Sequence, residues 1–325
     1  MPASISATLH TDPGCPWAYS ALPALRVLDW RYGDQIDWRV VVIGLTERSE
    51  QYVARGYTPG RVVESQIVFR ERFGMPFSLV PKARVAATAR ACRAIVAARL
   101  ADPGSEWRVL RALQLANFTT PLLLDDDGLL AAALRGVPGV DADALVARLD
   151  DPAVTEAYER DRAEARTADG SPPLLQGKTA DTDGLIRYTA PSLVLEAGGR
   201  RLEAGGWQPV EAYDVLVANL DPALRREPAP EGPEPLLRRY PEGLTTQEVA
   251  ALLVHGNDAL DRTGAEMALQ RLVAEGRATK TPMGHDAVWT IAGTPAPGVA
   301  APAVSAAGRA PSASGSSERR PVRAT

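Results

Sequence analysis

The sequence predicts an α/β protein made of two units that are joined by a proline-rich segment. Three observations support this prediction. The first 45 residues have the pattern strand, helix, strand; a long and mostly helical region follows; and β character returns at residues 190–207. With 325 residues, 45% of them hydrophobic, the chain is long enough for two domains with buried cores.

The first strand, helix and strand are marked by changes in hydrophobic period. Residues 5–9 alternate apolar and polar side chains and run into a Thr-Asp-Pro-Gly turn, which indicates a strand. Residues 16–32 carry apolar side chains at helical spacing, with Pro23 as an expected kink. Residues 36–45, IDWRVVVIGL, are rich in β-branched side chains and predict a buried strand.

The middle of the chain, about residues 50–180, predicts a helical insertion. Helical spacing is found in GRVVESQIVFRERF (60–73), ARVAATARACRAIVAARL (83–100), and residues 106–118, 128–134, 142–149 and 154–166. Three consecutive aspartates at 125–127 lack the alternation that a calcium loop requires, so they predict a helix-capping turn.

The β structure that follows completes the first domain. In residues 190–207, Gly198 and Gly199 separate two apolar runs and predict a hairpin. Residues 208–220 predict an amphipathic helix. The order β-α-β, helical block, β-β-α is that of a thioredoxin fold with an inserted helical domain, so we expect the first domain to span residues 1–222.

The rest of the chain divides into three parts. Residues 223–240 are rich in proline and poor in core candidates, which predicts a linker. Residues 241–293 predict two helices and a hairpin around Met283-Gly284-His285, an order that resembles a small winged-helix domain. Residues 294–325 are mostly Ala, Pro, Ser and Gly and predict a disordered tail.

Cys15 is the candidate nucleophile. It stands directly before Pro16 at the expected start of a helix, where unpaired backbone N–H groups and the helix dipole favour an anion. We therefore expect the pKa of Cys15 to fall from about 8.5 toward neutrality. Trp17 is expected to shield one side of the sulfur, and Tyr19 to line the groove. The alternative is an inert small residue at a strand-to-helix turn.

Three segments carry a resemblance to a known family. DPGCPWAY (12–19) resembles the Asp-Pro-x-Cys-Pro-Trp-Cys-Tyr signature of the DsbA-like oxidoreductases, APSLVL (190–195) resembles their cis-proline segment, and GGWQPVEAYDVLVANL (205–220) resembles their closing strand and helix. The resemblance covers about residues 5–222. It implies thiol-disulfide oxidoreductase activity, with Cys15 facing a cis bond before Pro191. It also implies that the backbone of Ala190 binds an extended substrate, next to Pro16, Trp17 and Tyr19.

The chain departs from this family at Ala18, which stands where the second cysteine of Cys-x-x-Cys is found. Cys15 therefore has no neighbouring thiol to clear a mixed disulfide. The leading hypothesis is a monothiol oxidoreductase whose mixed disulfides are resolved by an external thiol. The second is a small-thiol-dependent transferase or isomerase. The related kappa-class glutathione transferases and hydroxychromene-carboxylate isomerases are of this kind, and they have a serine at the position of Cys15. The third is a non-catalytic binding or regulatory protein that uses the winged-helix-like domain.

The helix predicted at 83–100 raises two further questions. Cys92 shares one face with apolar side chains and is expected to lie in the core, not to act as a resolving thiol. Five cations occur in residues 82–99 without an acid, namely Lys82, Arg84, Arg90, Arg93 and Arg99. We interpret them as a solvated face, with contact to an anionic substrate as the less favoured alternative.

Composition narrows the partners and the compartment. The net charge of −4 and the few basic side chains of the second unit leave nucleic-acid binding open but not favoured. No apolar run is long enough to cross a membrane, and the two cysteines with an N-terminus unlike a signal peptide favour the cytoplasm. The three scattered histidines form no metal motif, and His10 is either a base near Cys15 or a packed side chain. We expect no metal and no cofactor, apart from a low-molecular-weight thiol as a candidate co-substrate, and leave a homodimer open.

Overall fold

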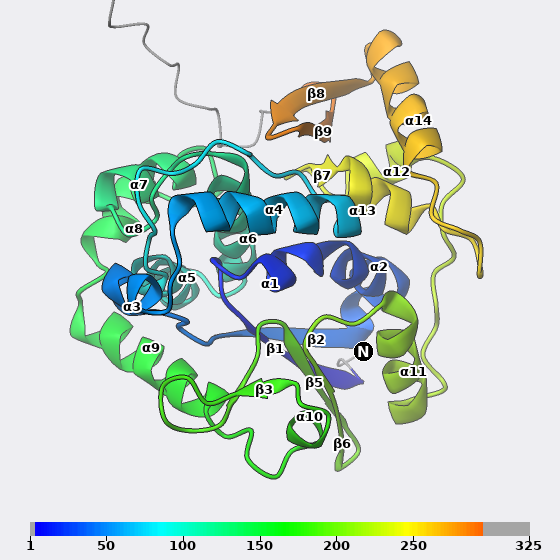
Figure 1. The fold of residues 1–325 in the computed structure, drawn as a ribbon. Helices are drawn as coiled ribbons and strands as arrows, with labels where there is room; N and C mark the ends of the chain where they lie inside the picture. Colours follow the sequence, from blue (N-terminus) through cyan, green and yellow to red (C-terminus); the bar gives the residue numbers. More distant parts are fainter. Residues whose placement is uncertain (1–3, 295–325) are drawn as a thin grey trace, which may run out of the picture.

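A four-stranded sheet with the order β2-β1-β5-β6 lies at the centre of the first domain (Figure 1). The computed structural model describes residues 4–294. In chain order, the elements of this domain are β1 (Ile5–Thr11), α1 (Pro16–Ser20), α2 (Leu22–Tyr32), a 3-10 helix (Gly33–Gln35), β2 (Ile36–Val42), α3 (Ser49–Ala54), α4 (Pro59–Phe73), α5 (Ala89–Ala101), α6 (Ser105–Thr119), α7 (Asp127–Leu134), α8 (Ala142–Ala147), α9 (Pro152–Ala165), α10 (Pro172–Leu175), β3 (Thr179–Ala180), β4 (Arg187–Tyr188), β5 (Ser192–Ala197), β6 (Arg200–Gly205) and α11 (Val210–Leu220).

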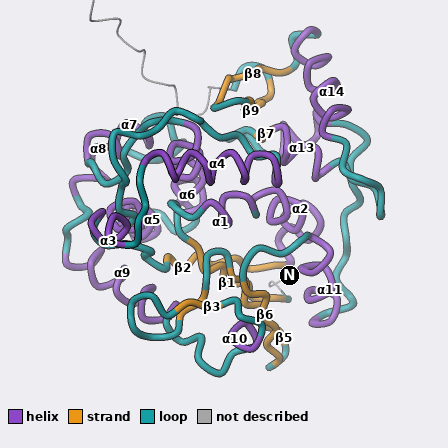
Figure 2. The backbone as a smooth tube through the Cα atoms, viewed as in Figure 1, coloured by secondary structure: helices purple, strands orange, loops and turns teal. Residues whose placement is uncertain are grey.

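The pairing of the strands confirms the predicted thioredoxin fold. β1 runs parallel to β2, with Ile5 opposite Ile36, and antiparallel to β5. β5 and β6 form the predicted hairpin, and its turn residues Gly198 and Gly199 have φ of 57° and 74°, where glycine is favoured. Helices α2 and α11 pack against one face of the sheet, and the insertion α3–α10 provides most of the remaining helices (Figure 2).

Two predicted helices have different bounds in the structure. The helix predicted at 16–32 is interrupted at Ala21, and Pro23 lies in the first turn of α2, where a proline costs no hydrogen bond. The helix predicted at 83–100 begins only at Ala89. The backbone N–H groups of Thr88 and Ala89 both donate to Thr46 O at 3.1 Å, so tertiary hydrogen bonds fix the preceding segment in a non-helical path.

The second unit consists of α12 (Pro233–Arg239), β7 (Leu244–Thr245), α13 (Thr246–Leu252), α14 (Arg262–Ala274), β8 (Ala278–Met283) and β9 (Asp286–Ile291). Its three strands form a sheet with the order β7-β9-β8. The predicted linker 223–240 is not wholly extended, because α12 forms within it and buries Leu236 and Leu237 completely. Such a short apolar pair between prolines gives little sign of a helix. The winged-helix likeness of this unit stays a prediction.

The second unit is packed firmly on the first. Val27 of α2 belongs to the same apolar cluster as Trp289 of β9. Arg111 of α6 donates to both carboxylate oxygens of Glu248 of α13, at 2.5 and 2.8 Å, and both side chains are buried. The tail predicted at 294–325 lies outside the described residues from 295 onward. Within residues 4–294, none of the helices combines the length and apolar character needed to cross a bilayer.

Candidate functional site

Cys15 lies where the first strand turns into the first helix. It is the N-cap of α1, with extended backbone (φ −88°, ψ 116°), and Pro16 occupies the first turn as predicted. The Cys15 N–H donates to Asp12 O at 3.1 Å, and the Gly14 N–H donates to Asp12 Oδ1 at 2.8 Å. These two bonds form the tight turn that places the sulfur at the helix start.

The predicted cis bond is present between Ala190 and Pro191, just before β5. The Cys15 thiol donates to Ala190 O at 3.0 Å, across 175 positions of sequence. This proximity arises because β1 and β5 are neighbours in the sheet, so the loop after β1 and the loop before β5 meet at one edge. Cys15, Ala190 and Pro191 therefore lie together, as the sequence predicts.

The electrostatic prediction for Cys15 is wrong in sign. Burial raises the pKa of Cys15 to about 12, and the backbone N–H of Ala18, the N–H of Trp17 and the charge of Arg187 lower it only in part. The Cys15 residue is only 7% exposed, and α1 has five residues, so its dipole is short. Desolvation of a thiolate outweighs these donors. In this state Cys15 is a thiol that donates a hydrogen bond.

The buried carboxyl group of Asp12, which the sequence analysis does not single out, holds the Cys15 loop in place. Asp12 accepts from Gly14 N and from Leu45 N, both at 2.8 Å, from Thr88 Oγ1 at 3.0 Å and from Cys92 Sγ at 3.4 Å. Burial raises the pKa of Asp12 above its ordinary value, although these donors act in the opposite direction. Its place in the Asp-Pro-Gly-Cys turn was the only sequence signal for this role.

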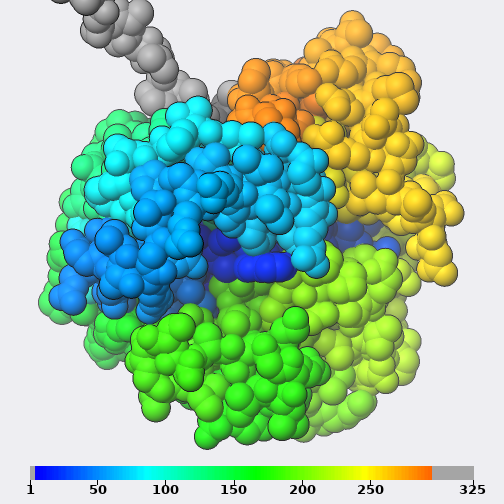
Figure 3. Space-filling model, viewed as in Figure 1, coloured from blue at the N-terminus to red at the C-terminus, as the bar shows by residue number. Residues whose placement is uncertain are grey.

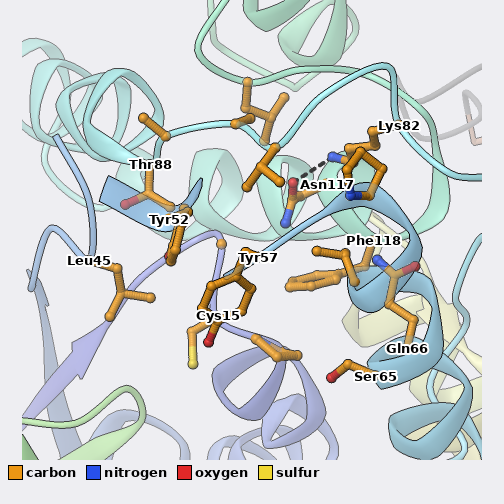
Figure 4. A pocket seen from close by; sticks show the side chains of 18 of the residues that line it. Cys15, Leu45, Tyr52, Tyr57, Ser65, Gln66, Lys82, Thr88, Asn117 and Phe118 are labelled. Carbon is orange, nitrogen blue, oxygen red and sulfur yellow. Dashed lines mark hydrogen bonds between the residues drawn. The ribbon is translucent and has the colours of Figure 1, made fainter. Parts of the chain in front are cut away.

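A cavity of about 440 Å³ opens beside Cys15. In Figure 3 the dark blue residues near the N-terminus are visible at the bottom of a furrow between the blue and cyan part of the helical insertion and the green part of the chain. One part of the wall is aromatic or apolar and includes Trp17, Tyr52 and Tyr57. Away from Cys15, Lys82 donates to Asn117 Oδ1 at 2.7 Å (Figure 4).

The two aromatic residues predicted for the groove have different places. Trp17 is 40% exposed, lines the cavity and packs edge-on against Phe69 at 4.9 Å between ring centroids, as expected of a shield. The prediction for Tyr19 is wrong, since it is fully buried and its ring stacks on Phe118 at 4.7 Å. Its hydroxyl donates to Pro76 O at 2.9 Å. Tyr19 points into the core because that face of α1 packs against the helical insertion.

The cations predicted as a solvated face are mostly paired with acids that lie far away in the sequence. The pairs are Arg84 with Asp125, Arg90 with Asp127 and Asp150, Arg93 with Asp150, and Arg99 with Asp161. Lys82 differs, because the oxygens that it binds, Asn117 Oδ1 and Leu122 O, are both neutral. Burial lowers the pKa of Lys82 to about 8. Lys82 is thus the cation of this group that faces the cavity without a direct carboxylate partner. In the aspartate cluster, Asp126 caps α7 as predicted.

Cys92 and His10 are both packed side chains. Cys92 is fully buried, as expected, and both cysteines are free thiols. His10 is 2% exposed and stacks on Tyr188 at 4.4 Å, and neither ring nitrogen has a hydrogen-bond partner within the described part of the chain. Burial lowers the pKa of His10 to about 4. His10 does not line the cavity, which favours the packing interpretation over that of a base for Cys15. Among residues 4–294, no cluster of His, Cys, Asp and Glu side chains is suited to hold a metal.

Comparison with known proteins gives one family and a set of similar structures. Residues 8–174 match the family described as DSBA-like thioredoxin domain. A candidate protein disulfide isomerase from Nitrosomonas europaea is 16% identical, with a TM-score of 0.51 over 66% of this chain and 97% of that chain. A probable DsbA oxidoreductase from Streptomyces coelicolor is 16% identical, with a TM-score of 0.51 over 67% and 91% of the two chains. A cytosolic disulfide reductase, DsbM, from Pseudomonas aeruginosa is 19% identical, with a TM-score of 0.48 over 67% and 100%. No match among curated protein sequences reaches significance.

Proposed function

Because the chain belongs to the DSBA-like thioredoxin domain family and has the fold of its thiol-disulfide oxidoreductases, we propose that it catalyses thiol-disulfide exchange through the single nucleophile Cys15. The observation that carries this proposal is the contact of 3.0 Å between Cys15 Sγ and the carbonyl oxygen before the cis-proline. This contact places the candidate nucleophile beside the backbone that is expected to hold an extended substrate.

The proposed reaction is an exchange of thiols with no net change in redox state. The deprotonated sulfur of Cys15 attacks one sulfur of a substrate disulfide, forming a mixed disulfide and releasing the other half as a thiolate, which takes up a proton. A low-molecular-weight thiol then attacks the substrate sulfur of the mixed disulfide. This second step restores the Cys15 thiol and forms a new disulfide between the two other partners. Ala18 cannot supply that second thiol, so the external thiol is a co-substrate.

The resting state of Cys15 adds a control step to this reaction. While the thiol donates to Ala190 O, it occupies one of the two lone pairs of that oxygen and competes there with an N–H from a substrate backbone. We propose that an extended substrate takes over this oxygen and frees the sulfur. The freed sulfur then moves into the cavity, where hydration and the donors at the start of α1 stabilise the thiolate. Substrate binding and activation of Cys15 are thereby coupled.

A second candidate function follows from the same hydrogen bond. A protonated Cys15 can donate to the thiolate of a bound small thiol, in place of the serine hydroxyl found in the related transferases and isomerases. Saturable binding of a small thiol without formation of a mixed disulfide distinguishes this candidate. A third candidate is a non-catalytic regulator. It is supported if Cys15→Ala leaves the function unchanged while deletion of residues 241–293 abolishes it.

We also propose a compartment and the classes of partner for this protein. Two free thiols in the described chain suit a reducing compartment, so we propose a cytoplasmic protein. We propose no nucleic-acid partner, because the hairpin that a winged-helix protein presents to a duplex has its turn packed against Phe77. We propose no metal or cofactor for the reaction, and a homodimer stays open.

Trapping the mixed disulfide tests the proposal. The Cys92→Ala chain is incubated with a small disulfide such as glutathione disulfide, and intact mass spectrometry follows the adduct. We expect one adduct, on Cys15, which added thiol removes. The matched Cys15→Ser, Cys92→Ala chain is expected to form none. An absence of adduct from the Cys92→Ala chain, with the fold intact, contradicts the proposal.

A further inference from the structure

The turn between β8 and β9, residues 283–285, is inserted against the first domain. The His285 N–H donates to Phe77 O at 3.2 Å, and the Phe77 N–H donates to His285 Nδ1 at 3.0 Å. Between these contacts, Gly284 has φ +57°, and a Cβ there would lie 2.7 Å from the carbonyl carbon of Phe77. The fit is close enough that only glycine allows it.

The segment that receives this turn, residues 75–77, is held from both domains. Thr245 Oγ1 of the second unit lies 3.6 Å from Met75 Sδ, and His285 binds Phe77. From the first domain, the Tyr19 hydroxyl donates to Pro76 O at 2.9 Å. Met75 and Phe77 are fully buried, whereas His285 is exposed, so the turn holds this segment from the surface of the molecule.

The same segment packs against the helix that begins at Cys15. Tyr19 lies in α1, and its ring meets the ring of Phe77 edge-on at 5.4 Å between centroids. Phe73, at the end of α4, contacts the ring of Trp17 at 5.7 Å. A continuous set of contacts therefore runs from the β8–β9 turn through residues 75–77 to α1.

We propose that the second unit positions Cys15, and that His285 is the positioning residue through which it acts. The proposed function rests on the reactivity of Cys15, and this inference names a part of the chain that sets that reactivity. By fixing residues 75–77, the β8–β9 turn holds α1 against the core and keeps the Cys15 thiol on Ala190 O. This role gives a physical reason for the presence of both units in one chain.

The test uses full-length chains in the Cys92→Ala background and measures the rate of Cys15 alkylation by iodoacetamide. His285→Gln removes the acceptor at the Nδ1 position, so α1 is held less firmly and Cys15 is exposed more often. We expect alkylation to become about three- to ten-fold faster, the change expected from the net loss of one hydrogen bond. His285→Asn places its Oδ1 near the position of Nδ1 and is expected to restore the original rate.

The matched control is Met267→Ala, which changes an exposed side chain of α14 and is expected to leave the rate unchanged. Thermal unfolding of each variant separates positioning from general stability. A lower melting temperature for His285→Gln with an unchanged alkylation rate overturns the proposal. Should His285→Gln fail to fold, Tyr19→Phe breaks the same set of contacts at Pro76, and an unchanged rate there overturns it equally. Because alkylation requires neither substrate nor mixed disulfide, this result is independent of the test of the proposed function.

Discussion

Removing the charge of Glu248 should weaken the packing of the second unit strongly. Glu248 is fully buried and accepts from both terminal nitrogens of Arg111 and from Thr245 N at 2.8 Å. In Glu248→Gln the shape is kept, but the Arg111 guanidinium, 5% exposed, loses the carboxylate that is its only ion-pair partner among residues 4–294. An unpaired buried charge costs about 3–5 kcal/mol, so the equilibrium constant for unfolding should rise by about a hundred-fold or more.

Urea unfolding followed by circular dichroism and by tryptophan fluorescence measures this loss, and Trp289, which is buried in the second unit, contributes to the fluorescence. Glu156→Gln is the matched control, because its partner Arg160 lies 2.6 Å away but both side chains are exposed, and we expect a change within about 0.5 kcal/mol. Replacing both members of the buried pair, with Arg111→Met and Glu248→Leu, should recover part of the loss, because Thr245 N and Gly243 O still lose their partners. If Glu248→Gln costs no more than Glu156→Gln, the reasoning is refuted.

Three further predictions concern the site and its surroundings. Gly14→Ala would place a Cβ 2.5 Å from Thr88 Cγ2, so it should lower the free energy of unfolding by about 1–3 kcal/mol. Adding Thr88→Ser removes this methyl group and should recover part of the loss in urea unfolding. If it recovers nothing, the steric explanation is contradicted. His10 is buried with its pKa lowered from 6.5 to about 4, so its neutral form stabilises the fold above pH 6.5. That contribution to the free energy of unfolding, about 3 kcal/mol, is lost as the pH falls to about 4. In urea titrations, His10→Phe should lose less stability than the unaltered chain over this pH range. An equal loss argues against this role of His10. Trp17→Ala removes the partly exposed shield of the cavity and should speed alkylation of Cys15 while weakening substrate binding; a slower reaction would contradict the shielding role.

Local sequence patterns predicted the strands of the sheet and the position of Cys15 at the start of a helix. The alternation at residues 5–9 and the β-branched run at 36–45 correspond to β1 and β2, and Gly198-Gly199 forms the turn between β5 and β6. Cys15 beside the Ala190–Pro191 cis bond follows from the order of the strands together with the family motifs. These features depend on short-range signals and on a topology that brings two loops to one edge.

The features that sequence reasoning missed depend on burial and on distant partners. The pKa of Cys15 rises because its sulfur is desolvated, a property that the presence of a helix N-terminus does not reveal. Tyr19 follows the motif but turns to the core to bind Pro76 O. The Asp12 contact with Thr88 joins positions separated by 76 residues, and no local pattern marks such a pair.

The most direct test of the account is the pH dependence of Cys15 alkylation in the substrate-free Cys92→Ala chain. With the thiol held on Ala190 O and its pKa raised to about 12, the rate should rise steadily from about pH 6 to pH 10 without a plateau. A plateau with a midpoint at or below about 8.5, the value of an ordinary cysteine, would show a sulfur that is already ionised at rest and would contradict activation by substrate binding.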